Sequence, residues 1–335
     1  MACEKQSQRV SERLPRLDEI DRAKGLAIIL VVLGHVVARE PPLGAEWYVA
    51  LKTTLYGFHM AFFMYLSGLV FALGYRELDT WNGYATYVRK RFMRLMPAYF
   101  GFALLVWVGK VISARFVHVD NPAGSLNDLI NVLLYPTGSF STFLWFIYAL
   151  FIICALVPVL LRLCRGDLRV ALLVACVVHF LPMPHIFALH MVFGFLPYFL
   201  LGCLVMRNQE EYFRLLDHYW VLWIAVFVLA LVFLDPSADK SWLGLAAIPA
   251  LHALVRVSPI SHWRFLACLG VCSFSIYLMN SLCIGVAKGV ITKFVSWDGA
   301  NFFWVAPILF IVGILLPILV KRGLFARLPA IDRAT

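Results

Sequence analysis

The stretch KGLAIILVVLGH, residues 24–35, begins the first of a series of long apolar runs in this chain. A helix that crosses a bilayer needs about 20 mostly apolar residues, and runs of this kind follow one another here with only short gaps. The sequence therefore predicts an all-α integral membrane protein, a bundle of about ten transmembrane helices. The predicted spans are roughly 24–40, 50–74, 92–113, 143–163, 168–181, 186–206, 219–235, 241–257, 266–287 and 301–320.

The composition excludes an ordinary soluble protein. Of the 335 residues, 62% are hydrophobic and only 14% are charged, whereas a soluble domain carries about 25% charged residues. A mean hydropathy of +0.83 leaves little surface that could face water. We expect one membrane domain at 24–321, between a cytoplasmic N-terminal segment at 1–23 and a cytoplasmic C-terminal tail at 322–335.

The basic residues support this threading independently. If the N-terminus is cytoplasmic, 22 of the 29 Lys and Arg residues fall on the cytoplasmic side of the predicted spans. Such a bias is the positive-inside rule, and it predicts both termini in the cytoplasm. It also explains the net charge of +10 without nucleic acid, because lipid headgroups are the ordinary partners of such charges.

One predicted outer loop, about 114–142, has helical features of its own. Ser125-Leu126-Asn127-Asp128 resembles a capping box, and apolar residues recur after it at helical spacing. This pattern predicts a short amphipathic helix lying on the outer membrane face.

The eight cysteines indicate no metal site. Most of them lie inside apolar runs, where Cys acts as a small hydrophobe. The sequence has no CxxC pair and no His/Cys spacing suited to zinc. We therefore expect no bound metal.

Three polar residues lie inside predicted spans. His35 follows Lys24 by eleven residues, or about 16 Å of helical rise, so it should lie near mid-membrane with Gly34 allowing a close approach. His59 falls at a similar depth on the next helix, and Asn280 lies within a later one. Ionisable groups in a membrane are costly, which makes such residues functional candidates. The alternative is that each only hydrogen-bonds a neighbouring helix.

Two arginines lie at the cytoplasmic end of the third span. Arg91 and Arg94 are three residues apart and therefore share a helix face. A pair of guanidinium groups suits a phosphate-bearing ligand, although lipid headgroups are an alternative partner. An imidazole at mid-membrane and cations at the cytoplasmic end of the bundle fit a protein that binds a phosphorylated donor from the cytoplasm. They also fit a proton-coupled transporter.

Five motifs occur in order along almost the whole chain. They are KGLAIILVVLGH (24–35), FHMAFFMYLSG (58–68), RFMRLMP (91–97), LWFIYALF (144–151) and SIYL (275–278). Together they resemble the signatures of the bacterial membrane-bound acyltransferase-3 family, with the fourth closest to its glycan O-acetylase branch. That family transfers acetyl or other acyl groups, generally from cytoplasmic acyl-CoA, to hydroxyls of envelope or exported glycans.

The resemblance implies roles for particular residues. His35 would be the central catalytic group, and His59 or Asn280 would orient it or stabilise the oxyanion. Many relatives have His where this chain has Asn280. This difference makes a catalytic base at position 280 less plausible and favours His35 as the base. The donor-binding residues would be Lys24, Arg91 and Arg94, and the substrate-binding candidates within the other motifs are Trp145, Tyr277 and Ser67.

These observations favour an acetyl-CoA-dependent O-acyltransferase in the bacterial cytoplasmic (inner) membrane. Acyl-CoA would be a co-substrate rather than a permanently bound cofactor, and the other partners would be a glycan or glycolipid acceptor and membrane lipids. Direct transfer and an acyl-histidine intermediate both stay open, as does the oligomeric state. The rival functions are a transporter or flippase without covalent chemistry, and a structural subunit of an envelope-glycan complex.

Overall fold

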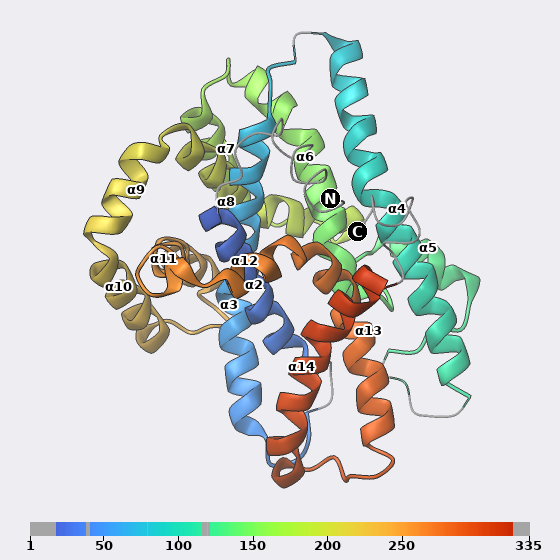
Figure 1. Ribbon diagram of the computed structural model, residues 1–335. Coiled ribbons are helices and arrows are strands. Elements are labelled where there is room, and N and C mark those ends of the chain that lie inside the picture. The colour runs from blue at the N-terminus through green and yellow to red at the C-terminus, as the bar shows by residue number, and fades with distance from the viewer. Residues whose placement is uncertain (1–17, 38–40, 79, 116–118, 120, 324–335) are drawn as a thin grey trace, which may run out of the picture.

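The structure is a computed structural model that describes residues 18–37, 41–78, 80–115, 119 and 121–323. Within these residues the chain forms helices and no strand (Figure 1). The all-α fold is therefore as predicted. The α-helices are α2 (Asp18–His35), α3 (Glu46–Gly74), α4 (Trp81–Ser113), α5 (Leu126–Leu134), α6 (Trp145–Leu163), α7 (Leu168–His179), α8 (Leu189–Arg207), α9 (Gln209–His218), α10 (Trp220–Phe233), α11 (Lys240–Leu254), α12 (Arg264–Val271), α13 (Ser273–Ile291) and α14 (Gly299–Gly323).

Each of the ten predicted spans coincides with at least one helix, but the helices differ in length. Six helical segments in the described part of the chain are long and apolar enough to cross a membrane, or seven if the bent pair α9 and α10 is one span. The others are shorter or more charged. α7 has 12 residues and α11 has 15, and α2 carries acidic residues in its first turn. The chain is a multi-pass membrane protein, and ten crossings remain a prediction.

The first helix differs from its predicted bounds of 24–40. α2 begins at Asp18 and ends at His35. Acidic residues in its first turn, which include Glu19 and Asp21, interact favourably with the positive end of the helix dipole, so the helix extends into the polar segment. At its other end α2 stops earlier than predicted, so His35 is its last residue rather than an interior one.

The ninth predicted span, 266–287, is wrong as a single helix. It is divided at Cys272 into the short helix α12 and the longer helix α13. α12 packs against the first half of α2, where two glycines allow the backbones to touch. A Cβ on Gly25 would lie 2.0 Å from the Leu266 carbonyl oxygen, and one on Gly270 would lie 1.8 Å from that of Asp21. This crossing requires α12 to turn away from the line of α13.

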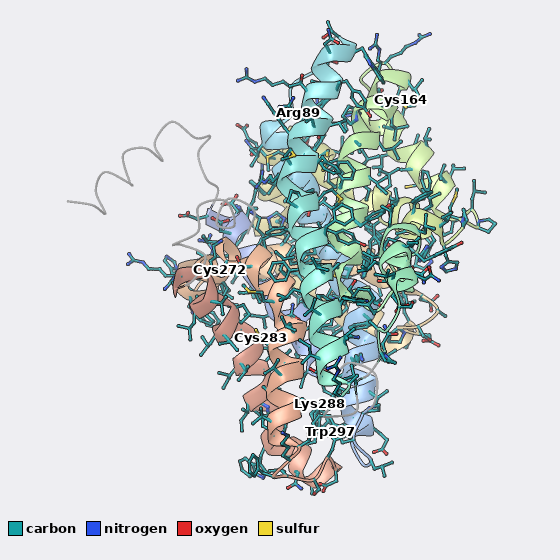
Figure 2. The ribbon with its side chains drawn as sticks, turned by 90° about the vertical axis from the view of Figure 1, so that its right-hand side faces the viewer. Arg89, Cys164, Cys272, Cys283, Lys288 and Trp297 are labelled. Atoms are coloured by element: carbon teal, nitrogen blue, oxygen red, sulfur yellow. The ribbon has the colours of Figure 1, made fainter. Side chains whose placement is uncertain are left out.

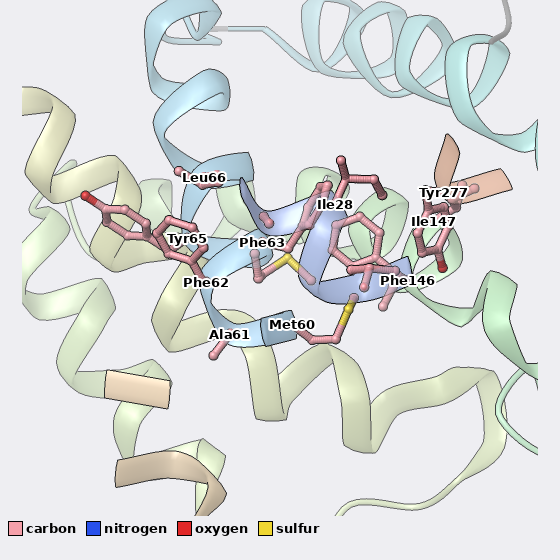
Figure 3. Close-up of a cluster of buried hydrophobic side chains, with 14 of the residues drawn as sticks. Ile28, Met60, Ala61, Phe62, Phe63, Tyr65, Leu66, Phe146, Ile147 and Tyr277 are labelled. Carbon is pink, nitrogen blue, oxygen red and sulfur yellow. The ribbon is translucent and has the colours of Figure 1, made fainter. Parts of the chain in front are cut away.

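The core of the bundle gathers side chains from four helices. Ile28 of α2, Phe63 of α3, Phe146 of α6 and Tyr277 of α13 all lie in one cluster of buried residues (Figure 3). The rings of Phe63 and Tyr277 both meet Phe146, with centroids 5.3 and 5.5 Å apart. α13 packs directly against α2, and Phe146 of α6 links it to α3, although α13 is far from both α2 and α3 in sequence.

The two ends of the bundle agree with the predicted alternation of loops. Arg89 lies at one end of the molecule, and Lys288 and Trp297 lie at the other (Figure 2). The predicted threading assigns Arg89 to the cytoplasmic side and Lys288 to the outer side. Their separation is what this threading requires, and which end faces the cytoplasm stays a prediction.

The predicted amphipathic helix is present as α5. The Asp128 carboxylate accepts hydrogen bonds from the backbone N–H groups of Gly124 and Ser125, both at 2.9 Å. These bonds hold the pKa of Asp128 below its usual value. α5 is anchored to the bundle by Tyr99, whose hydroxyl donates to the Val132 carbonyl at 2.6 Å. Its position on the outer membrane face remains a prediction.

Candidate functional site

The imidazole of His35 meets the side-chain amide of Asn280 at the centre of the site. Nδ1 of His35 lies 2.9 Å from Oδ1 of Asn280, although 245 residues separate the two along the chain. Asn280 is fully buried, seven residues into α13, while His35 keeps part of its surface exposed at the end of α2. The packing of α13 against α2 brings the two side chains together.

The hydrogen bonds of Asn280 determine which nitrogen of His35 carries the proton. The amide nitrogen Nδ2 donates to the carbonyl oxygens of Ile276 and Tyr277 at 2.9 and 2.8 Å. Its oxygen Oδ1 therefore faces His35, and it also accepts from the Ser281 hydroxyl at 3.2 Å. Because this oxygen can only accept, Nδ1 of a neutral His35 holds the proton and Nε2 keeps its lone pair. That nitrogen is the one available to act as a base.

Tyr56 links His35 to the second candidate histidine. The ring centroid of Tyr56 lies 6.2 Å from that of His35 and 5.2 Å from that of His59. The Tyr56 hydroxyl donates to the Gly34 carbonyl at 3.2 Å, and a Cβ on Gly34 would lie 2.8 Å from the Tyr56 ring. Gly34 therefore permits the close approach expected of it, with Tyr56 as the neighbour.

His59 is fixed within its own helix. Its Nδ1 lies 2.5 Å from the Leu55 carbonyl oxygen, which can only accept, so Nδ1 carries the proton. The side chain is buried. His59 thus shares the Tyr56 ring with His35 as a neighbour.

The depth of His35 follows from its neighbour on α3. Tyr56 lies ten residues after the start of α3, which corresponds to about 15 Å of rise. α2 and α3 run in opposite directions (Figure 1), and α2 ends beside the first half of α3, where Tyr56 lies. The imidazole therefore lies within the span of α3 and not at either of its ends.

The candidate donor-binding residues lie toward the other end of α3. The Arg91 guanidinium lies over the rings of Phe71 and Tyr87, 5.8 and 5.4 Å from their centroids. Arg94 is exposed one turn later on α4. Lys24, on α2, is half-buried and lies 3.5 Å from the Asp21 carboxylate. Arg91 and Arg94 thus share one region of α4.

The three candidate substrate-binding residues are not brought to the imidazole. Trp145 packs against Phe195, with ring centroids 5.2 Å apart. The Tyr277 hydroxyl donates to the Phe143 carbonyl, and the Ser67 hydroxyl donates to that of Phe63 at 2.9 Å. Both hydroxyls are used within the fold. Tyr277 still contributes to the site, because its own carbonyl holds the Asn280 amide.

A family model for an acyltransferase domain, that of the acyltransferase-3 family, matches residues 17–322. The chain belongs to this family. The match covers nearly the whole chain, including both His35 and Asn280, so the acyltransferase-3 domain is the membrane bundle itself. Searches of curated proteins and of solved structures find no match.

Membership of the acyltransferase-3 family makes this protein a membrane acyltransferase. The arrangement can perform that chemistry, since Nε2 of His35 can accept a proton from a hydroxyl that attacks an acyl donor. No group of three His, Cys, Asp or Glu side chains that could hold a metal ion occurs in the described ranges.

Two features of the site were missed in the sequence. Nothing in the sequence indicates that Tyr56 belongs to the site, because a tyrosine in an apolar run looks like any aromatic residue of the core. Lys52 and Lys240 were counted only as charges that fix the topology, yet both line one cleft with Tyr56. The available signal was Lys52, a charged residue two positions inside the predicted span 50–74.

Proposed function

We propose that the protein transfers an acyl group, acetyl in the simplest case, from acyl-CoA to a hydroxyl of an envelope or exported glycan. The observation that supports this most is the hydrogen bond between His35 and Asn280, which leaves the lone pair of Nε2 available within the bundle. We place the reaction in the bacterial cytoplasmic membrane, with the phosphates of the donor on the side of Arg91.

In the proposed reaction the acceptor hydroxyl attacks the thioester carbonyl carbon. Nε2 of His35 takes the hydroxyl proton as the new C–O bond forms, and Asn280 holds the resulting imidazolium in place through Nδ1–H. The C–S bond then breaks, and the imidazolium returns the proton to the leaving sulfur, which gives the ester and free CoA. General-base catalysis of this kind contributes about 10²–10⁴-fold to a rate, and positioning of the two substrates contributes further.

The distance between the two arginines, Arg91 and Arg94, and the imidazole of His35 suits a long donor molecule. Arg91 lies over Phe71, fifteen residues farther along α3 than Tyr56, which is about 22 Å of helical rise. A donor with its phosphates at Arg91 and Arg94 must therefore extend deep into the bundle to bring its thioester to His35. Acyl-CoA has this form, with phosphates at one end of a flexible arm and the thioester at the other.

A direct assay separates an acyltransferase from a transporter. Purified protein in lipid nanodiscs is mixed with acetyl-CoA, and free CoA thiol is measured with and without a glycan fraction from cells that lack the protein. We expect CoA release that rises when the glycan is added, together with a new acetyl ester on the glycan by mass spectrometry. Binding or movement of glycan with no CoA release and no ester would favour the flippase.

The donor site has its own prediction. Arg91→Ala combined with Arg94→Ala should raise the KM for acetyl-CoA by about tenfold or more, because each lost hydrogen bond to a charged group weakens binding by about 1.5–3 kcal/mol. The matched control is Arg89→Ala with Lys90→Ala, which removes two exposed positive charges from the same helix. An equal change in KM for both pairs would indicate that Arg91 and Arg94 serve the lipid headgroups instead.

A further inference from the structure

The end of α2 carries the proposed base, His35, but lacks the residue that often caps a helix. The last four carbonyl groups of an α-helix have no partner within the helix, and a glycine just beyond the end commonly completes the cap. Here Val36 and Val37 follow His35, and the next glycine is Gly44. Partners for these carbonyl groups come instead from α3.

One face of α3 supplies the partners. Tyr48 and Tyr56 are eight residues apart, which places them two turns apart on similar sides of the helix. The Tyr48 hydroxyl donates to the Leu33 carbonyl at 2.8 Å, and the Tyr56 hydroxyl donates to the Gly34 carbonyl at 3.2 Å. Tyrosines from a single helix therefore bind two of the last three carbonyl groups of α2. We call Tyr48 and Tyr56 the tyrosine clamp.

The clamp also holds the segment that follows α2. The backbone N–H of Val37 donates to the Tyr48 hydroxyl at 3.2 Å, and the Lys52 ammonium group donates to the Val37 carbonyl at 2.8 Å. Tyr48 is itself buried, and its ring packs edge-on against Phe302 of α14, with centroids 5.2 Å apart. Because Tyr48 contacts both α2 and α14, it fixes the end of α2 relative to the rest of the bundle.

Tyr56 contacts the imidazole as well as the backbone beside it. Its ring meets the His35 ring edge-on, with centroids 6.2 Å apart and 89° between the planes. The three atoms nearest to an added Cβ on Gly34 all belong to the Tyr56 ring, the closest at 2.8 Å. Asn280 holds Nδ1 of the same imidazole at 2.9 Å. The orientation of His35 is therefore set by Asn280 and Tyr56 together.

We infer that the tyrosine clamp positions the proposed base: Tyr48 and Tyr56 end α2 at His35 and orient the imidazole so that Nε2 meets the acceptor hydroxyl. Neither tyrosine has to touch a substrate, so both are positioning residues. A misplacement of about 1 Å can lower a rate by about 10²-fold, so even a small movement of His35 has a large effect. The inference rests on the proposed function for catalysis, but not for the capping of α2.

The first test removes the two hydroxyl groups and keeps both rings. Tyr48→Phe and Tyr56→Phe should each lower kcat by about three- to tenfold, the effect of one ordinary hydrogen bond, and the double variant by about 10²-fold. The KM for acetyl-CoA should stay nearly unchanged, because the donor is proposed to bind at Arg91. The matched control is Tyr84→Phe, which removes a hydroxyl that donates to the Ala155 carbonyl at 3.0 Å and should keep the parent kcat.

This comparison separates positioning from a purely structural role. All rates are measured on monodisperse protein in nanodiscs, and the unfolding midpoint of each variant is measured in detergent. A lower midpoint in the double variant, with the kcat of the parent protein, would show that the tyrosines only stabilise the bundle. A higher KM for acetyl-CoA with unchanged kcat would also overturn the inference.

The second test uses the contact between Gly34 and the Tyr56 ring. Gly34→Ala should lower kcat by about 10²-fold, because the added Cβ displaces either the ring or the end of α2. Tyr56→Leu removes the nearest ring atom, so Gly34→Ala should have little further effect in that background. Such non-additivity is expected of residues in contact. Equal losses from Gly34→Ala in both backgrounds would contradict a role for this contact.

The third test measures the capping of α2 without using catalysis. Hydrogen exchange is followed by mass spectrometry in peptides that cover the last turn of α2 and Val37. We expect exchange about tenfold faster in the variant Tyr48→Phe with Tyr56→Phe, because a lost hydrogen bond makes local opening easier. Tyr84→Phe should leave this exchange unchanged. Exchange at the parent rate in the double variant would overturn the clamp.

The outcomes also separate this inference from the proposed function. Faster exchange in the double variant, with no release of CoA from acetyl-CoA by the parent protein, would refute the acyltransferase mechanism and leave the clamp as the cap of α2. CoA release and ester formation by the parent protein, at a kcat that the double variant keeps, would refute the positioning role alone.

Discussion

His35→Gln is expected to lower the rate of acyl transfer by about 10²–10⁴-fold, which is the contribution typical of a general base. The glutamine amide can still donate to Oδ1 of Asn280, so the hydrogen bond that joins α2 to α13 can be kept. What it lacks is a nitrogen with a lone pair that can take a proton. The loss should therefore fall on kcat, with the KM for acetyl-CoA nearly unchanged. The measurement is the rate of ester formation on the glycan in nanodiscs.

A second histidine serves as the matched control for this variant. His218 is exposed at the end of α9, and His218→Gln makes the same chemical change there. We expect His218→Gln to keep the full rate, and both variants to keep the elution profile of the parent protein. If well-folded His35→Gln retained more than about a tenth of the rate, general-base catalysis by His35 would be excluded.

The sequence predicted the secondary structure well because the apolar runs are long and local. It also suggested that an amide at position 280 could orient an imidazole, and the two side chains are in contact. It did not predict that α2 would end at His35, or that Cys272 would divide the ninth span. The packing of α12 against α2 depends on backbone contacts of Gly25 and Gly270 with partners more than 240 residues away, which no local pattern encodes.

The cleft lined by Lys52, Tyr56 and Lys240 illustrates another limit of reasoning from sequence. Lys52 and Lys240 lie 188 positions apart, and each alone fits the rule that assigns charges to loops and membrane faces. Only the packing of α11 against α3 shows that they share a surface. A site that is assembled from distant helices is therefore the part of the protein that the sequence alone does not predict.

The crossing of α3 and α8, like that of α2 and α12, should be highly sensitive to a single added methyl group. A Cβ on Gly68 would lie 2.0 Å from the Phe199 carbonyl oxygen, and one on Gly202 would lie 2.2 Å from that of Tyr65. Overpacking usually costs about 1–3 kcal/mol when side chains can adjust, but here the obstacle is backbone. We expect Gly68→Ala and Gly202→Ala each to lose about 3 kcal/mol or more. The readout is the unfolding midpoint in detergent and the yield of monodisperse protein.

Two other helical glycines test whether this loss comes from the crossing or from alanine itself. Gly101 on α4 and Gly285 on α13 have no heavy atom within 4 Å of an added Cβ. Alanine there should be neutral, or stabilising by up to about 0.5–1 kcal/mol, since glycine is a poorer helix former. If Gly202→Ala melted like Gly101→Ala, the helices would have to lie farther apart. α3 also carries Tyr56, so a looser crossing would let the tyrosine move from His35, and activity should fall together with stability.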